Sequence, residues 1–286
     1  MIRVGTRGSA LALAQAGWVA ERLPGEVAVV TISTSGDRGA QADKSRFVKE
    51  IEEALLAGEI DLAVHSAKDV PAELPTGLSI VGVPARADPA DALCGAGALS
   101  ELADGAVVGT ASIRRRAQLA ALRPELEIRE LRGNVDTRLR RLADGDFDAI
   151  VLAAAGLARL DRADAGAPLP ELVPAAGQGC LALEARSDDA QVAEAVAALT
   201  DRGALTALTA ERALVTALGA TCDTPVGALA EPAGGELRLT AFVGRPDGSH
   251  WIRDELEGDL AEPAALGRAA AERLLSAGAR ELLDLP

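Results

Sequence analysis

Three short stretches of the sequence bring together side chains that could do chemistry. The first, HSAKDVP, places His65, Lys68 and Asp69 in one loop that follows an apolar run. A carboxylate such as Asp69 could move protons or stabilise a developing cation in a cleft. The alternative is that Asp69 is an ordinary turn residue before a proline-bounded loop. His65 directly follows the apolar run, which favours a structural role for it.

The second stretch is a basic island in an acidic chain. The formal net charge is −14, yet residues 111–141 hold nine arginines against four acids. In GTASIRRRAQL, Ser112 is placed to cap a helix whose first turn carries Arg114 and Arg115. Helix N-termini and guanidinium forks both favour anions, so this turn predicts a binding site for carboxylates or phosphates. The alternative is a solvated helix face.

LRGNVDTRLRRL repeats this arrangement. Gly133 permits a tight turn, Asn134 could cap a helix, and Arg132 and Arg138 flank its start. Two helix starts with the same chemistry strengthen the case for a small polyanion as ligand. The macrodipole alone would place arginine at helix C-termini instead.

The third stretch, GATCDTPVG, holds Cys222 in a loop. The other cysteines, Cys94 and Cys180, stand beside apolar runs and are expected to be less accessible. A reactive thiolate needs nearby positive charge, and Asp223 opposes it. From these residues alone, Cys222 is either an ordinary free cysteine or a nucleophile activated from elsewhere in the fold.

Composition excludes several classes of function. The overall acidity argues against a broad nucleic-acid surface, and two Trp, three Phe and no Tyr argue against a base-stacking platform. Three cysteines without a C-x-x-C spacing and two histidines argue against a disulfide framework or a structural zinc site. No nucleotide-binding or metalloprotease motif is present. The sequence has no apolar stretch long enough for a membrane span and no signal-peptide layout at its start, so we expect a cytoplasmic protein.

The elements that must position these residues alternate between strand and helix over the first 200 residues. Apolar runs such as IRVGT and IDLAVHS each lead into a helical pattern or a loop, which predicts α/β sheets with crossover helices. VGTRGS near the start and VGTAS at Val108 share one pattern, a strand, a Gly-Thr turn and a serine that opens a helix. This echo suggests two similar α/β lobes.

The last part of the chain has a different character. A helix, ALTALTAERALVTALG, precedes the cysteine loop. The alternating strands ELRLTAFV and HWIRDELE follow, joined by the turn GRPDGS, and an amphipathic helix closes the chain. We expect a small α+β domain with a three-stranded antiparallel sheet.

Taken in order, these segments resemble the hydroxymethylbilane synthase (porphobilinogen deaminase) family over nearly the whole chain. The blocks HSAKDVP, SIRRRAQL and LRGNVDTR are the most selective part of the match. The resemblance implies two α/β domains similar to type II periplasmic binding proteins, with an active-site cleft between them, and the small third domain. The implied boundaries are 1–86 with 178–199 for domain 1, 87–177 for domain 2 and 200–286 for domain 3.

The resemblance also implies the roles of individual residues. Cys222 matches the cysteine that carries a covalent dipyrromethane cofactor through a thioether, and Asp69, with Lys68 beside it, matches the catalytic aspartate. The cofactor-binding side chains correspond to Lys68, Asp69, Ser112, Arg114, Arg115 and Arg132. The substrate-binding side chains correspond to Arg7, Ser9, Phe47, Arg138 and Arg159.

The implied reaction explains the arginines. Four porphobilinogen molecules, each bearing an acetate and a propionate, add head to tail to the cofactor with loss of ammonia, and water then releases hydroxymethylbilane. The growing chain therefore gains two carboxylates per ring, which fork-shaped, permanently charged guanidinium groups can hold. Asp69 would stabilise the cationic pyrrole and assist proton transfer. No metal, nucleic acid or membrane is implied, and the family suggests a monomer.

Two features near the implied catalytic and binding residues depart from the family pattern. The loop at residues 38–46, which is expected to act as a lid, is shorter than in the family, and Ala90 stands where an arginine is common.

One reading from another class stays open, a cytoplasmic protein that binds or senses small carboxylates on the same two-lobed scaffold. A further alternative is another transferase that handles carboxylates without a covalent pyrrole. The third domain and its loop cysteine favour the synthase, because a plain binding protein needs neither.

Overall fold

The computed structural model describes residues 1–34, 48–221 and 223–283. They form two compact units, residues 1–87 with 180–206 and residues 88–179 with 207–286, each of which is described by itself. The three-domain boundaries expected from the sequence remain a prediction, while the described residues contain the three expected sheets.

The first unit is built on a mixed five-stranded sheet with the order β2-β1-β3-β10-β4. β1 pairs in parallel with both β2 and β3, whereas β10 runs antiparallel to β3 and β4. Its strands are β1 (Ile2–Arg7), β2 (Val27–Ile32), β3 (Leu62–Ser66), β4 (Leu78–Gly82) and β10 (Leu181–Arg186).

Helices cover both faces of this sheet. Val4, Leu62 and Leu183 pack on one face with α1 (Ala10–Ala20) and α6 (Ala190–Ala197). On the other face, Ile51 and Leu55 of α2 (Lys49–Leu56) belong to a hydrophobic cluster with Ala63 of β3. Each helix therefore buries one apolar stripe, as the 3.6-residue period predicts.

The loop after β3 differs slightly from expectation. Residues Ala67–Asp69, which the sequence placed in a loop, form one turn of 3₁₀ helix. Pro71 restricts the backbone only of the residue before it, Val70, which is extended. Residues Ala67–Asp69 are not restricted by Pro71 and can form the turn.

The second unit contains a five-stranded sheet with the order β7-β6-β8-β5-β9. β6 pairs in parallel with β7 and β8, and β5 runs antiparallel to β8 and β9. Its strands are β5 (Asp91–Cys94), β6 (Val107–Gly109), β7 (Glu127–Arg129), β8 (Ala149–Ala153) and β9 (Ala167–Leu169).

Three helices follow the parallel strands of this sheet. They are α3 (Ile113–Leu122), α4 (Val135–Ala143) and α5 (Ala154–Ala158). Ser112 caps α3 by accepting a hydrogen bond from Arg115 N at 3.4 Å, and Asn134 caps α4 by accepting one from Thr137 N at 2.9 Å. Ser9 caps α1 in the same way, so all three predicted caps are confirmed.

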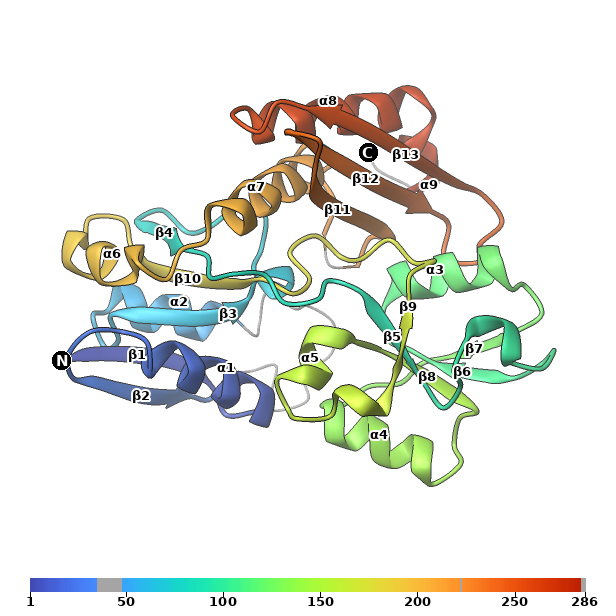
Figure 1. Cartoon of the computed structure of the whole chain (residues 1–286), viewed down its shortest axis with the longest axis horizontal. Coiled ribbons are helices and arrows are strands. Elements are labelled where there is room, and N and C mark those ends of the chain that lie inside the picture. The colour runs from blue at the N-terminus through green and yellow to red at the C-terminus, as the bar shows by residue number, and fades with distance from the viewer. Residues whose placement is uncertain (35–47, 222, 284–286) are drawn as a thin grey trace. The chain divides into compact units, whose positions relative to one another are not determined.

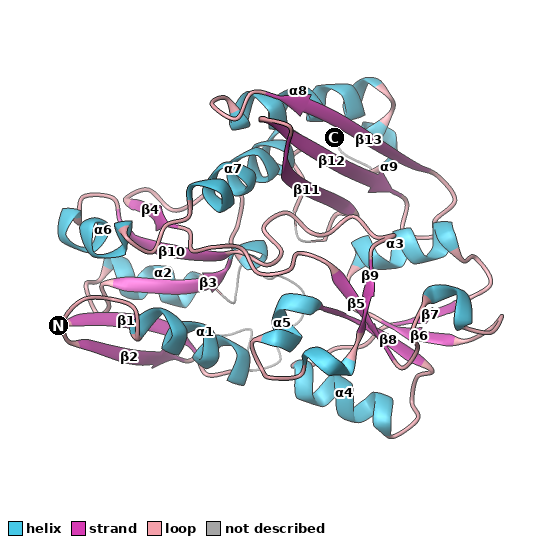
Figure 2. Ribbon diagram, viewed as in Figure 1, coloured by secondary structure: helices cyan, strands magenta, loops and turns pink. Residues whose placement is uncertain are grey.

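The second unit also holds a three-stranded antiparallel sheet in the order β11-β12-β13. Its strands are β11 (Val226–Ala233), β12 (Glu236–Gly244) and β13 (Trp251–Gly258). The helices of this part are α7 (Arg202–Ala217), which begins in the first unit, α8 (Pro263–Ser276) and α9 (Ala279–Leu282). α8 lies along one face of the sheet, where Leu266 and Leu274 pack on Leu239 (Figures 1 and 2).

The two five-stranded sheets have the same topology, although the chain supplies their strands differently. β1 corresponds to β6, β2 to β7, β3 to β8, β10 to β5 and β4 to β9, with the same parallel and antiparallel pairings. The echo between the two Gly-Thr pairs therefore falls at equivalent places, at the ends of β1 and β6. Gly5 and Thr6 still belong to β1, so the turn predicted there is wrong, whereas Gly109 is the last residue of β6. The predicted architecture of two similar α/β sheets and a small antiparallel sheet is confirmed.

Candidate active site

In the first unit, the predicted catalytic residues follow the ends of parallel strands. β1 ends at Arg7, and the 3₁₀ turn with Lys68 and Asp69 follows the end of β3. Because β1 and β3 are parallel neighbours, their carboxyl ends share one edge of the sheet. Ligand sites of open α/β sheets lie at such edges.

A small pocket of about 60 Å³ lies at this edge. Its wall includes Arg7, Ser9, Asp69 and also His65. Lys68 is half-buried and does not contribute to this wall. The structure thus brings three of the predicted residues together with a histidine for which the sequence favoured a structural role.

Behind the pocket, His65 belongs to a buried group with two carboxylates. His65 Nε2 lies 3.1 Å from Glu184 Oε2 on the neighbouring strand β10, and both side chains are almost fully buried. Glu52 of α2 packs toward the same face and is also buried. Burial, followed by the charge of Glu184, raises the pKa of Glu52 to about 7. Glu52 thus binds a proton more tightly than an ordinary glutamate does.

In the second unit, the arginines gather at the equivalent edge. β6, β7 and β8 are mutually parallel, and their carboxyl ends lead into the starts of α3, α4 and α5. The starts of α3 and α4 carry the predicted binding residues Ser112 and Arg132, and Arg159 ends α5. The predicted polyanion site therefore has a common structural origin, one edge of one sheet.

The first two arginines of α3 converge on a buried aspartate that the sequence analysis missed. Asp91 Oδ1 accepts hydrogen bonds from Arg115 Nη2 at 2.7 Å, from Arg115 Nε at 3.0 Å and from Arg114 Nη2 at 3.3 Å. Gln178 Nε2 donates a fourth at 2.8 Å. Asp91 Oδ2 lies 2.9 Å from Arg114 Nη1 as an ion pair. Arg114 and Arg115 are therefore fixed from within the fold.

The electrostatics of this cluster leave an excess of positive charge. Burial alone would raise the pKa of Asp91, but Arg114 and Arg115 outweigh it and hold that pKa well below its usual range. Burial lowers the pKa of Arg114, and Asp91 partly restores it. Two buried guanidinium groups therefore face one buried carboxylate, and Arg114 Nε has no hydrogen-bond partner. Such an arrangement attracts a further anion.

The remaining predicted arginines are more open. Arg132 is exposed and donates to Glu130 at 2.7 Å, while Arg138 Nε donates to Gly133 O at 2.7 Å. Arg159 Nη2 donates to Gly179 O at 2.7 Å. Glu130 and, to a smaller extent, Asp223 raise the pKa of Arg132. Asp223 belongs to the cysteine loop, so this loop interacts electrostatically with Arg132.

Two predicted residues and the expected lid lie outside the described residues, namely Phe47, Cys222 and residues 38–46. The other two cysteines, Cys94 and Cys180, are fully buried, as expected. Burial raises the pKa of Cys94 to about 11, so this thiol is a poor nucleophile.

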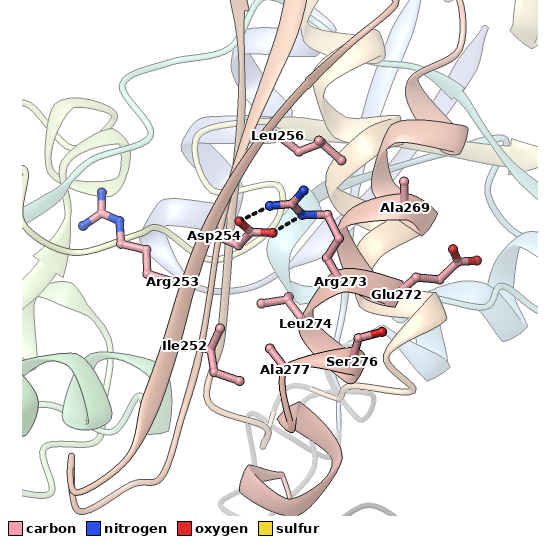
Figure 3. A pocket seen from close by; sticks show the side chains of 10 residues that line it. All are labelled: Ile252, Arg253, Asp254, Leu256, Ala269, Glu272, Arg273, Leu274, Ser276 and Ala277. Carbon is pink, nitrogen blue, oxygen red and sulfur yellow. Dashed lines mark hydrogen bonds and ion pairs between the residues drawn. The ribbon is translucent and has the colours of Figure 1, made fainter.

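A wider groove of about 740 Å³ lies elsewhere, between β13 and α8. Asp254 and Arg273 form a two-point ion pair across it, with 2.6 and 2.8 Å between the paired atoms (Figure 3). None of the predicted site residues lines this groove, so we assign it no part in the site. In the described part of the chain, no cluster of three His, Cys, Asp or Glu side chains could hold a metal ion. No helix within residues 1–34, 48–221 and 223–283 could cross a membrane.

Asp91, Gln178, Glu184 and Glu52 are the polar residues that sequence reasoning missed. Asp91 and Glu184 each stand within an apolar strand, in ADALC and LALEA. A carboxylate in such a strand is rarely buried without a partner, and this signal could have found both. Their partners come from distant parts of the chain and leave no local pattern.

Two family models match most of the chain. A family model described as "Porphobilinogen deaminase, dipyromethane cofactor binding domain" matches residues 2–194, and "Porphobilinogen deaminase, C-terminal domain" matches residues 205–276. A porphobilinogen deaminase of Thermus thermophilus is 51% identical over 99% of this chain and 98% of its own length. One of Deinococcus radiodurans is 47% identical over the same shares.

Solved structures give a looser likeness. A periplasmic substrate-binding protein of an ABC transporter from Coxiella burnetii is 19% identical and covers 72% of this chain and 94% of its own, with a TM-score of 0.41. A putative methionine-binding lipoprotein from Bacillus subtilis is 12% identical and covers 69% and 89%, with a TM-score of 0.44. We draw nothing from what these proteins bind.

Proposed function

Because the chain belongs to the porphobilinogen deaminase family, we propose which of its side chains bind, position and transform the substrate. Its activity is that of porphobilinogen deaminase, the transferase also called hydroxymethylbilane synthase, in tetrapyrrole biosynthesis. Its substrate is porphobilinogen, and residues 2–194 form a dipyrromethane-cofactor-binding domain. Of the functions that the sequence left open, family membership selects the synthase.

One observation carries the assignment of roles, the grouping of side chains at the carboxyl ends of parallel strands in each sheet. In the first unit this edge presents Asp69 and Lys68, and in the second it presents the arginines of α3 and α4. We assign the chemistry to the first edge and the binding of carboxylates to the second.

The second edge fits an anionic cofactor. The Asp91 cluster has an excess of one positive charge, and Arg114 Nε is buried without a partner. Ser112 and the free backbone N–H groups at the start of α3 add further donors. In the second unit, the dipyrromethane carboxylates would be held by Ser112, Arg114, Arg115 and Arg132. In the first unit, Lys68 and Asp69 are also proposed cofactor-binding residues, Lys68 for a carboxylate and Asp69 for a pyrrole N–H.

The substrate carboxylates are assigned to the more open cations. Arg138 and Arg159 stand at the arginine edge, and Arg7 and Ser9 line the pocket of the first unit. A guanidinium fork binds a carboxylate through two parallel hydrogen bonds, which fixes orientation as well as position. Phe47 completes this proposed set.

Asp69 is the proposed catalytic group. When bound, the dipyrromethane supplies the nucleophilic pyrrole carbon to which substrate units are joined. The Asp69 carboxylate would accept a hydrogen bond from a pyrrole N–H, stabilise the positive charge on that ring and assist the departure of the proton. Lys68, next in the same turn, would hold a carboxylate nearby.

Cys222 is the proposed attachment point of the cofactor. On either side of it in the sequence, Thr224 N donates to Thr221 O at 3.1 Å. The electrostatic effect of Asp223 on Arg132 supports a position of this loop near the arginine edge. Intact-protein mass spectrometry with peptide mapping tests the attachment.

We expect the added mass of dipyrromethane on the Cys222 peptide of the wild type and on that of the matched control Cys94→Ser. The Cys222→Ser variant should lack it. Normal cofactor attachment in Cys222→Ser would refute the assignment. If the wild type is unmodified, adding porphobilinogen and weighing the protein again distinguishes an apo preparation, which gains pyrrole units, from a wrong assignment, which gains none.

We also propose that the chain works as a monomer in the cytoplasm, as its family resemblance suggests. Sedimentation equilibrium should give a mass near the 29.2 kDa of one chain. A mass of twice that value would overturn the monomer.

A further inference from the structure

Helix α3 presents two different faces to its surroundings. On one face, Arg115 Nη1 donates to Val151 O of β8 at 2.8 Å, and Leu119 packs in the core of the five-stranded sheet. The other face carries Arg114, Ala117, Gln118 and Ala121, spaced as one helical stripe. This second face, which we call the outer face of α3, does not contact the five-stranded sheet through its apolar residues.

The outer face is tied to the three-stranded sheet through residues 173–174. Gln118 donates to Val173 O at 3.0 Å and accepts from Val173 N at 2.7 Å, and Arg114 Nη1 donates to the same Val173 O at 2.5 Å. Pro174 O then accepts from Ala228 N of β11 at 2.8 Å. Ala117, Val173 and Phe242 of β12 form a small apolar cluster beside these bonds.

A second contact comes from the turn between β12 and β13, the GRPDGS motif. Gly248 N donates to Arg245 O at 2.9 Å, and Gly248 has a φ of +72°. A Cβ on this glycine would lie 2.4 Å from Ala121 N and 2.5 Å from the carbonyl carbon of Ala120. The turn therefore touches the backbone of α3 itself, and only glycine permits that approach. Figure 1 shows this end of the hairpin beside α3.

The contact of Gly248 with the C-terminal end of α3 can influence the position of the helix start. Residue 121 and Arg115 are six residues apart, about 9 Å along a helix axis. Arg115 is in turn fixed to Asp91, so a displacement of α3 at its far end strains the contacts that hold the guanidinium groups. A packed helix transmits such a shift because protein interiors are dense and resist compression.

We propose that Gly248 is a positioning residue, whose contact with α3 fixes where the Ser112–Arg115 turn stands and thereby how tightly that turn binds carboxylates. The proposal rests on the proposed function, in which this turn binds the carboxylates of the cofactor to which porphobilinogen is joined. The three-stranded sheet would thus set the position of the arginines at the start of α3.

The chain offers a matched control for this test. Gly234, in the turn between β11 and β12, also has a positive φ, +58°, but a Cβ there would meet no atom within 4 Å. Gly248→Ala and Gly234→Ala therefore share the strain of a left-handed alanine, about 1 kcal/mol. They differ in the contact with α3.

Steady-state kinetics on the holoenzymes separates positioning from stability. We expect Gly248→Ala to raise KM for porphobilinogen about tenfold, with kcat within about twofold of the parent, because the displaced turn moves the cofactor ring that porphobilinogen must meet. Gly234→Ala should leave both constants within about twofold. An unchanged KM in folded Gly248→Ala would overturn the proposal.

If Gly248→Ala does not fold, Phe242→Leu decides the question. It removes the ring from the cluster with Ala117 and Val173 without adding volume, and should raise KM about threefold. An unchanged KM would again overturn the proposal.

Arg115→Lys distinguishes a failure of the positioning role of Gly248 from a failure of the binding role of α3. If Arg115→Lys raises KM and Gly248→Ala does not, only the positioning role fails. If Arg115→Lys leaves KM unchanged, the proposed binding role of α3 fails, and the positioning role fails with it.

Discussion

The two five-stranded sheets of this molecule have one topology and opposite chemistries. At the edge where their parallel strands end, the first sheet presents Asp69 and, behind it, the buried group of His65, Glu184 and Glu52. The second presents arginines anchored on Asp91. One sheet thus gathers titratable groups, and the other gathers permanent positive charge. In the function we propose, the same scaffold serves both tasks, because function depends on the loops at the strand ends.

The largest expected effect is the loss of turnover when the carboxylate of Asp69 is removed. Asp69→Asn keeps the size of the side chain but removes the carboxylate, so we expect kcat to fall by about 10²–10⁴. Far-ultraviolet circular dichroism should be unchanged. The exposed Glu73→Gln, a few residues along the same loop, is the control and should keep full activity. Undiminished turnover in Asp69→Asn would remove the catalytic role of this edge.

The second prediction breaks the anchor of the arginine edge. Asp91→Leu leaves two buried guanidinium groups without their carboxylate, and we expect the free energy of unfolding of the second unit to fall by about 3–5 kcal/mol. Trp251 fluorescence during urea unfolding, in a Trp18→Phe background, reports this unit. Breaking the exposed pair with Asp254→Leu should have a much smaller effect. A loss below about 1 kcal/mol in Asp91→Leu would show that the cluster is not an anchor.

The third prediction concerns pH and the proton-holding group of the first unit. Because the pKa of Glu52 is raised to about 7, the folded state holds more protons than the unfolded state between about pH 4.5 and 7. The free energy of unfolding therefore falls as pH rises through this window, by about 3 kcal/mol at most. Glu52→Gln stays neutral and should lose this slope, so that it gains stability over the parent at pH 8.

Trp18 fluorescence in a Trp251→Phe background follows the unfolding of the first unit at pH 5 and pH 8. Glu59→Gln, at an exposed position just after α2, serves as the control and should keep the slope of the parent. Equal slopes in Glu52→Gln and its parent would contradict a raised pKa.

The elements and much of the candidate site follow from local sequence. Ser9, Ser112 and Asn134 are helix caps, and Lys68–Asp69 and Arg132 follow strand ends, because caps and strand ends are governed by neighbouring residues. The partners that complete the site do not follow. Asp91 is 23 residues from Arg114, and Glu184 is 119 residues from His65, so only the sheet topology brings them together.

The arginine motif illustrates the same limit. From the sequence, Arg114 and Arg115 were either anion ligands or a solvated helix face. The structure excludes the solvated face, because both are buried against Asp91, which fixes them and still leaves one positive charge in excess. Their role as anion ligands stays a prediction.

One measurement tests the division between the two edges most directly, steady-state kinetics of Asp69→Asn and Arg138→Gln side by side with porphobilinogen. We predict that Asp69→Asn lowers kcat with KM within about threefold of the parent, because its role is confined to the chemical step. Arg138→Gln should raise KM about tenfold or more, with kcat much less affected, because a carboxylate contact is lost. If both variants change the same constant to the same extent, the assignment of chemistry to one sheet edge and binding to the other is wrong.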